Sequence, residues 1–136
     1  MLAPTRPHDQ NLHASDAIRR SRLSHLTLLA RHVALFNQGV RSGDFAPMLE
    51  QFSDDAELVF EGVPTGPFHG KETIAAAYES NPPHDEVDVL SSEQADDGTI
   101  VARYAWRANG GRPAGRMIFT PRGEQIARLV VTFEPA

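Results

Sequence analysis

The spacing of apolar residues changes once along the chain, from a helical period in the first half to a period of two in the second. Between residues 15 and 41 apolar side chains recur on one helical face, at Leu29, Val33, Phe36 and Val40. Ser15 is a typical helix N-cap residue, and no helix breaker follows before Gly39. This pattern predicts a long first helix whose apolar face packs inward.

Residues 43–78 predict a short helix, a strand, a tight loop and another helix. The short helix has apolar residues at positions i, i+3, i+4 and i+7, namely Phe45, Met48, Leu49 and Phe52. The Ser-Asp-Asp sequence at 53–55 is typical of a turn, and a strand is expected from Ala56 to Phe60. Two glycines and two prolines within 62–67 predict a loop, and the next helix is expected over about 71–79.

After residue 86 apolar and polar residues alternate, which predicts four strands, at Val87–Gln94, Thr99–Ala108, Arg112–Thr120 and Gln125–Phe133. Glycine-containing turns at 95–98, 109–111 and 121–123 separate the strands, as is typical of antiparallel hairpins. Helices that precede a run of antiparallel strands favour an α+β fold, with the helices on one face of a curved sheet.

The composition narrows the class of protein. A length of 136 residues fits one domain, and we interpret 1–14 as a flexible tail before a single domain at 15–136. A formal net charge of -5 disfavours a nucleic-acid partner, and the absence of cysteine excludes disulfides and thiolate chemistry. The chain has no apolar run of membrane-spanning length, and its N-terminus lacks the apolar core of a secretion signal, so a cytoplasmic protein is expected.

The order of these elements, and three stretches within it, resemble the ketosteroid isomerase-like and SnoaL-like proteins of the nuclear transport factor 2-like superfamily. The resemblance covers about residues 26–134, and the stretches are GDFAPMLEQFSDDAELVF, FHGKETIAAAY and GEQIARLVVTFEP. The resemblance implies a cone-shaped fold, with three N-terminal helices packed on a curved, mostly antiparallel sheet around a deep apolar pocket. Because this fold hosts isomerases, cyclases, epoxide hydrolases, dehydratases and non-catalytic binding domains, it does not define one activity.

The resemblance also indicates where the catalytic groups of ketosteroid isomerases would fall in this chain. Their oxyanion-donating tyrosine corresponds to Phe36, and their general-base aspartate corresponds to Phe60. Their protonated aspartate falls near Gly115 or Arg116, whereas a supporting tyrosine is retained as Tyr78. Because phenylalanine cannot transfer a proton, authentic steroid isomerase activity is not expected.

The candidates for acid, base or hydrogen-bond catalysis are Glu61, Tyr104 and His69. Glu61 is the carboxylate nearest the position of the base, although strand alternation also allows a solvated loop carboxylate there. Tyr104 would offer a phenol within an apolar wall. Histidine titrates nearer to neutral pH than other side chains, so His69 is the third candidate, with bracing of its loop as the alternative role.

Six residues are expected to bind a ligand in the pocket: Phe36, Phe60, Tyr78, Trp106, His32 and Met117. Tyr104 and Trp106 alternate on the strand face that the resemblance turns inward, and the simpler alternative is that both only fill the interior. For His32, one turn before Phe36, the alternative is an ordinary surface or core histidine. Histidines and carboxylates do not have the spacing of a metal site, and no cofactor is expected.

These features favour a cofactor-independent isomerase, cyclase or hydratase that acts on a hydrophobic polyketide-, steroid- or terpenoid-like compound. The alternatives are a non-catalytic ligand-binding domain and a protein-interaction domain of the same fold. The expected partner is a small hydrophobic molecule, with neither a nucleic acid nor a membrane. A homodimer is also predicted through the outer sheet face, where arginines mix with apolar residues: Arg103, Arg107, Arg116, Val101, Ala105, Ile118 and Val130.

Overall fold

The computed structural model describes residues 27–134, which form three α-helices and one six-stranded sheet. The first helix covers residues 27–42, and the other two are α2 (Ala46–Leu49) and α3 (Lys71–Ser80). The strands are β1 (Phe52–Glu61), β2 (Phe68–His69), β3 (Val87–Gln94), β4 (Ile100–Trp106), β5 (Pro113–Arg122) and β6 (Gln125–Thr132). The predicted tail at 1–14 and the predicted N-cap at Ser15 lie outside the described residues.

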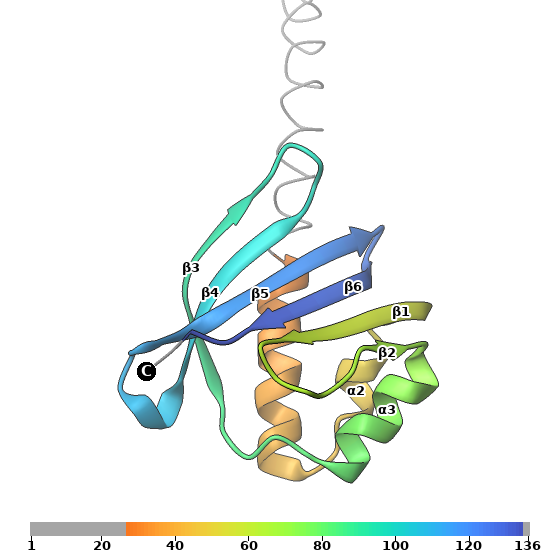
Figure 1. Cartoon of the computed structure of the whole chain (residues 1–136), viewed down its shortest axis with the longest axis horizontal. Helices are drawn as coiled ribbons and strands as arrows, with labels where there is room; N and C mark the ends of the chain where they lie inside the picture. The colour runs from red at the N-terminus through yellow and green to blue at the C-terminus, as the bar shows by residue number, and fades with distance from the viewer. Residues whose placement is uncertain (1–26, 135–136) are drawn as a thin grey trace, which may run out of the picture.

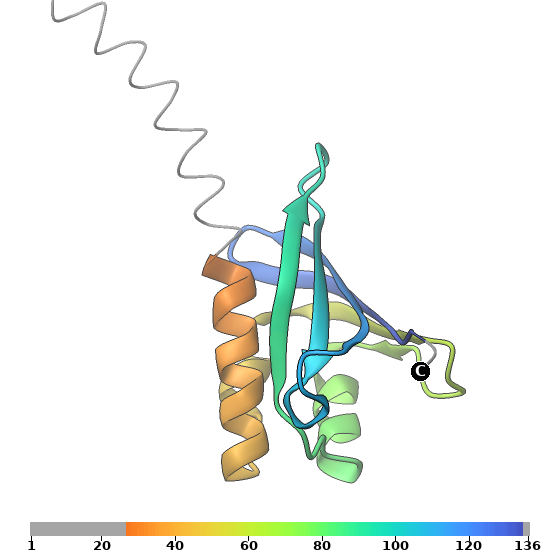
Figure 2. The same ribbon diagram turned by 90° about the vertical axis from the view of Figure 1, so that its left-hand side faces the viewer.

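The six strands follow the order β2-β1-β6-β5-β4-β3 across the sheet. Neighbouring strands are antiparallel except for β1 and β6, which run parallel with Leu58 opposite Leu129. The last strand of the meander therefore returns beside the first strand of the chain. Figures 1 and 2 show that the sheet is bent and that the helices cover one side of it. This arrangement confirms the predicted α+β fold.

The first helix turns its predicted apolar face toward the sheet. The residues of this face, all buried or packed against the core, are Leu29, Val33, Phe36 and Val40. The ring of Phe45 crosses this helix at Gly39, where a Cβ would come within 2.3 Å of the ring. Glycine is required at this position because the aromatic ring packs directly on the helix backbone, which brings α2 close to the first helix.

The first helix also holds the start of β3 through one side chain. Asn37 donates from Nδ2 to the carbonyl of Val87 at 3.0 Å and accepts from the Val87 N–H at 2.8 Å. Both residues are buried, so this pair of bonds satisfies polar groups that water cannot reach. These bonds therefore fix the C-terminal end of the segment that connects α3 to β3.

The strand β1 begins earlier than the sequence pattern indicates, at Phe52 rather than Ala56. The polar residues 53–55, predicted to form a turn, lie within this strand. The register of β1 against β6 shifts between Phe52 and Glu57, so an irregularity in the ladder accommodates the polar residues without ending the strand. Phe52 is buried as predicted, but it belongs to the sheet and not to the short helix.

Other boundaries also differ from the prediction. The strand β5 continues to Arg122, two residues beyond its predicted end at Thr120 and into the predicted turn at 121–123. The loop at 62–67 is followed by the two-residue strand β2, which pairs with β1 and was not predicted. The strand β4 ends at Trp106, two residues before the predicted end, because Arg107–Asn109 forms a 3₁₀ turn. The helix α3 and the strand β3 agree with the predicted ranges to within one residue.

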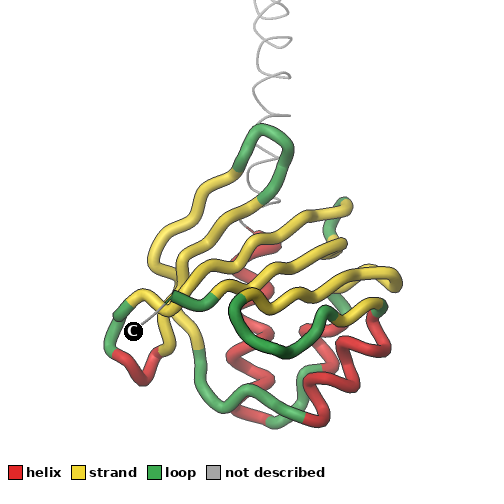
Figure 3. Tube along the Cα trace, viewed as in Figure 1, coloured by secondary structure: helices red, strands yellow, loops and turns green. Residues whose placement is uncertain are grey.

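The outer face of the sheet, away from the helices, is partly charged and partly apolar. Arg103 and Arg116 are exposed and lie opposite each other on β4 and β5, and Ile118 is half-buried. Ala105 and Val130, also expected here, are buried. The β3–β4 hairpin extends beyond the rest of the sheet in Figure 3. A homodimer through this face stays a prediction.

Within 27–134, no helix has the length and apolar character needed to cross a membrane.

Candidate functional site

A cavity of about 620 Å³ lies between the sheet and the helices. Its wall comes from the first helix, β1, the β1–β2 loop, α3 and the segment after it, and the strands β4, β5 and β6. The aromatic lining residues are Phe36, Phe60, Phe68, Tyr78, Tyr104, Trp106 and Phe133. Among the described residues, no aspartate, glutamate, lysine or arginine lines the cavity. The site is therefore apolar and carries no formal charge.

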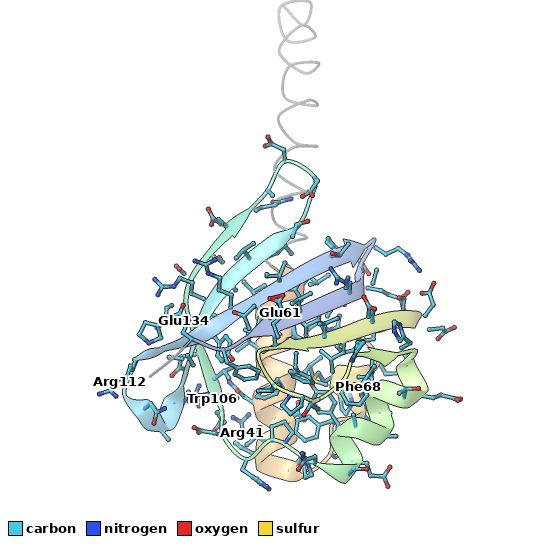
Figure 4. All side chains as sticks on the ribbon, in the orientation of Figure 1. Arg41, Glu61, Phe68, Trp106, Arg112 and Glu134 are labelled. Atoms are coloured by element: carbon cyan, nitrogen blue, oxygen red, sulfur yellow. The ribbon has the colours of Figure 1, made fainter. Side chains whose placement is uncertain are left out.

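At one end of the cavity, beside the β1–β2 loop, the wall is formed by a group of aromatic rings. The ring of Phe60 stacks on Phe133 at a centroid distance of 6.3 Å and meets Phe68 edge-on at 6.2 Å. Val63 in the β1–β2 loop and Phe133 remain 40% and 39% exposed, so this end borders solvent. Phe68 and Trp106 line the cavity from opposite halves of the sheet (Figure 4).

The imidazole of His32 is a buried polar group of the cavity wall and is only 2% exposed. The rings of Phe52 and Phe119 pack against it in T-shaped arrangements at centroid distances of 6.0 and 5.2 Å. Its Nδ1 lies 3.1 Å from Oε1 of Gln51, the residue that connects α2 to β1. Burial lowers the pKa of His32 from 6.5 to about 4, and the Gln51 hydrogen bond opposes this shift in part. The imidazole is therefore neutral at pH 7.

Two phenols and an indole supply the other hydrogen-bonding groups of the aromatic wall. Tyr104 donates from its hydroxyl to the carbonyl of Thr132 at 3.1 Å, and its ring meets Trp106 edge-on at 5.6 Å. Burial and the nearby charge of Glu134 raise the pKa of Tyr104 to about 12. Burial also raises the pKa of Tyr78. Both phenols stay protonated at pH 7 and can only donate or accept hydrogen bonds.

Most of the predicted site residues meet in this cavity. Those that line it are His32, Phe36, Phe60, Tyr78, Tyr104, Trp106 and Met117. Two predicted catalytic residues do not. Glu61 is exposed at the end of β1, because strand alternation turns it away from the side to which Phe60 points. His69 has a side chain that is 70% exposed, and its Nδ1 lies 3.4 Å from a carboxylate oxygen of Glu57 outside the cavity.

The positions that correspond to isomerase catalytic groups supply no acid or base to the cavity. Phe36 and Phe60 line it, but their rings cannot transfer a proton. Gly115 has no room for a side chain, since a Cβ there would lie 1.8 Å from the carbonyl oxygen of Thr132. Arg116 is exposed.

Sequence reasoning missed the residues that irregular segments bring to the cavity: Val63, Thr65, Asn81, Pro83 and Phe133. The Gly/Pro content of 62–67 predicts a loop but not the direction in which that loop folds. Gln51 was also missed, because two polar residues, Glu50 and Gln51, separate Leu49 from Phe52, and the sequence does not indicate which of them is buried. Within the described range, groups of three or more histidines and carboxylates that could hold a metal ion are absent.

A bent six-stranded sheet, helices on one side of it and an apolar cavity between the two layers define an NTF2-like protein. The model of the SnoaL-like domain family matches residues 30–134. This chain therefore belongs to the SnoaL-like domain family. The search of curated proteins found no match.

Solved structures support the same fold. An NTF2-like protein of unknown function from Burkholderia xenovorans has a TM-score of 0.65 at 19% identity, with 85% of this chain and 86% of that chain covered. A Bacillus subtilis protein described as a proposed isomerase has a TM-score of 0.64 at 16% identity, with 82% and 89% covered. A de novo designed protein with a curved β-sheet has a TM-score of 0.59 at 13% identity, with 84% and 88% covered. These structural similarities establish the fold, and the low sequence identities support no particular activity.

Proposed function

We propose that this protein binds a small, uncharged and mainly apolar molecule in the cavity. The observation that carries this proposal is the absence of charged side chains from the described cavity lining. An ionised ligand would lose its hydration without gaining a counter-charge, which is strongly unfavourable. An apolar ligand gains roughly 25 cal/mol for each Å² of its surface that leaves water.

The size of the cavity supports a ligand of several fused or linked rings. Its volume of about 620 Å³ falls within the range that holds drug-sized molecules. Polyketide-, steroid- and terpenoid-like compounds combine this size with a low density of polar groups. The hydroxyl and amide groups of Thr65, Thr73, Ser80 and Asn81 add a limited number of hydrogen-bonding positions to the wall.

A second candidate function is turnover of such a compound without a cofactor, by isomerisation or a related reaction. The phenols of Tyr78 and Tyr104 and the imidazole of His32 favour it, because positioned hydrogen bonds can stabilise charge in a transition state. The relative described as a proposed isomerase has the same fold. The missing carboxylate weighs against proton-shuttle chemistry. Binding is therefore the primary proposal.

Ligand-induced stabilisation tests the proposal. Thermal unfolding would be followed with neutral steroids, polyketides and terpenoids, each beside a carboxylated analogue of similar size. A ligand at 100 times its dissociation constant should add about 2.7 kcal/mol to the free energy of unfolding. Trp106→Ala, which alters the cavity wall, should abolish the shift, whereas Arg112→Ala at an exposed position should not. No shift with any neutral compound, or a larger shift with the charged analogues, would refute the proposal.

A further inference from the structure

The contact between His32 and Gln51 fixes which ring nitrogen of the histidine carries a hydrogen. The amide oxygen Oε1 of Gln51 can only accept, and it lies 3.1 Å from Nδ1. Nδ1 must therefore carry the hydrogen of the neutral imidazole. The other nitrogen, Nε2, then has a free lone pair and acts only as an acceptor.

The second nitrogen opens into the cavity. Within 27–134, every buried side-chain nitrogen or oxygen has a hydrogen-bond partner. Within the same range His32 has one side-chain hydrogen bond, at Nδ1, so Nε2 is not among the fully buried atoms and borders open space. Since His32 lines the cavity and is 2% exposed overall, that space is the interior of the cavity.

We propose that Nε2 of His32 accepts a hydrogen bond from a hydroxyl group of the ligand. This inference rests on the proposed function and names its substrate class: a neutral, mainly apolar alcohol, phenol or enol. Gln51 holds Nδ1, and the rings of Phe52 and Phe119 pack against the imidazole in T-shaped arrangements, so the imidazole keeps this orientation and does not donate from Nε2. An ether or carbonyl oxygen in the same place would face the Nε2 lone pair with its own lone pairs.

The site therefore distinguishes a ligand with a free hydroxyl group from the same ligand in which that hydroxyl is methylated or removed. A hydroxyl that donates to Nε2 replaces the hydrogen bond that it loses to water. A methyl ether leaves Nε2 unpaired in an apolar cavity, which disfavours binding by roughly tenfold or more. Gln51 contributes to the selection without touching the ligand, as a positioning residue that fixes the tautomer.

Binding of matched neutral probes tests this inference. One series is hydroxypyrene, methoxypyrene and pyrene. The other is estrone, which has a single hydroxyl group, with its 3-methyl ether and its 3-deoxy form. Dissociation constants would be measured at pH 7 from quenching of the single tryptophan, Trp106, which lines the cavity. The wild type should bind the hydroxyl member of at least one series roughly tenfold or more tightly than the methyl ether.

Variants separate a specific role of His32 from a structural one. His32→Leu removes the acceptor, and Gln51→Leu frees the imidazole to move its hydrogen to Nε2. Both should bring the preference for hydroxyl over ether close to one. His69→Leu, at a side chain that is 70% exposed, is the matched control and should leave the preference unchanged. Nitrogen NMR of the wild type provides a readout independent of the variants, since only the hydroxyl probe should shift the Nε2 resonance of His32.

The possible outcomes distinguish this inference from the proposed function. Equal affinities for hydroxyl, ether and parent compound in the wild type would overturn the role of His32 but leave the apolar binding site intact. A preference that survives both His32→Leu and Gln51→Leu would also overturn it. Failure of both probe series and of the neutral panel to bind would overturn the proposed function and this inference together.

Discussion

Acid should destabilise this protein through His32 at pH values where most carboxylates are still ionised. Burial lowers the pKa of His32 from 6.5 to about 4. In the unfolded chain the imidazole is hydrated and takes up a proton near pH 6.5, whereas the folded chain does so only near pH 4. Between these values the unfolded state binds more protons. The contribution of His32 is therefore complete above about pH 6.5 and is lost as the pH falls toward 4.

The size of the effect follows from the difference between the two pKa values. Each unit of difference corresponds to about 1.4 kcal/mol, so protonation of His32 should cost about 2 kcal/mol between pH 7.5 and pH 5. Acidification to pH 4 should extend the loss to about 3 kcal/mol. Folded domains are typically stable by roughly 5–15 kcal/mol, so a loss of this size is readily measurable.

Urea unfolding followed by Trp106 fluorescence would measure the effect in the wild type, in His32→Leu and in His69→Gln. The free energy of unfolding of His32→Leu should fall less between pH 7.5 and pH 5 than that of the wild type, by about 2 kcal/mol. His69→Gln should follow the wild type, because the side chain of His69 is 70% exposed. If the curves of His32→Leu and the wild type fall in parallel, the reasoning from burial is wrong.

Three further substitutions test other parts of the structure. Asn37→Ala should lower the free energy of urea unfolding by about 2–4 kcal/mol, because the buried N–H and carbonyl of Val87 lose their partner; a loss below 1 kcal/mol would contradict this. Gly115→Ala should lower the melting temperature with a loss of at least about 2 kcal/mol, since its Cβ would lie 1.8 Å from the carbonyl oxygen of Thr132; wild-type stability would contradict it. Tyr78→Phe should change stability by less than about 1 kcal/mol in the same assay, because its hydroxyl makes no hydrogen bond to a described residue; a larger loss would reveal one.

The fold was largely predictable because periodicity reports local structure directly. The inward positions of the first helix and the alternation in the last four strands describe buried faces, which sequence spacing encodes. The start of β1 was not predictable in this way. Its polar residues 53–55 favour a turn locally, and only pairing with β6 across the sheet keeps them in a strand. The strand β2 has two residues, which is too short to show a period.

The candidate site was predictable where it depends on strand alternation and less so where it depends on distant contacts. Phe60 and Trp106 face the cavity as their positions on β1 and β4 indicate, and the same alternation explains why Glu61 does not. The partner of His32 could not be derived from spacing, because Gln51 lies 19 residues further along the chain. Its contact exists only after α2 has turned the chain back toward the first helix.

Burial gives His32 two properties that together bear on whether this cavity supports turnover. The imidazole stays neutral at pH 7, which preserves its lone pair for a hydrogen bond. Its pKa of about 4, however, makes it a weak base, and a general base works best when its pKa lies near the working pH. A reaction in this cavity is therefore better served by a ligand hydroxyl polarised through its hydrogen bond to His32 than by removal of a proton from carbon. Selective binding requires no proton transfer, so the residues that line the cavity need only supply apolar contacts and a hydrogen bond.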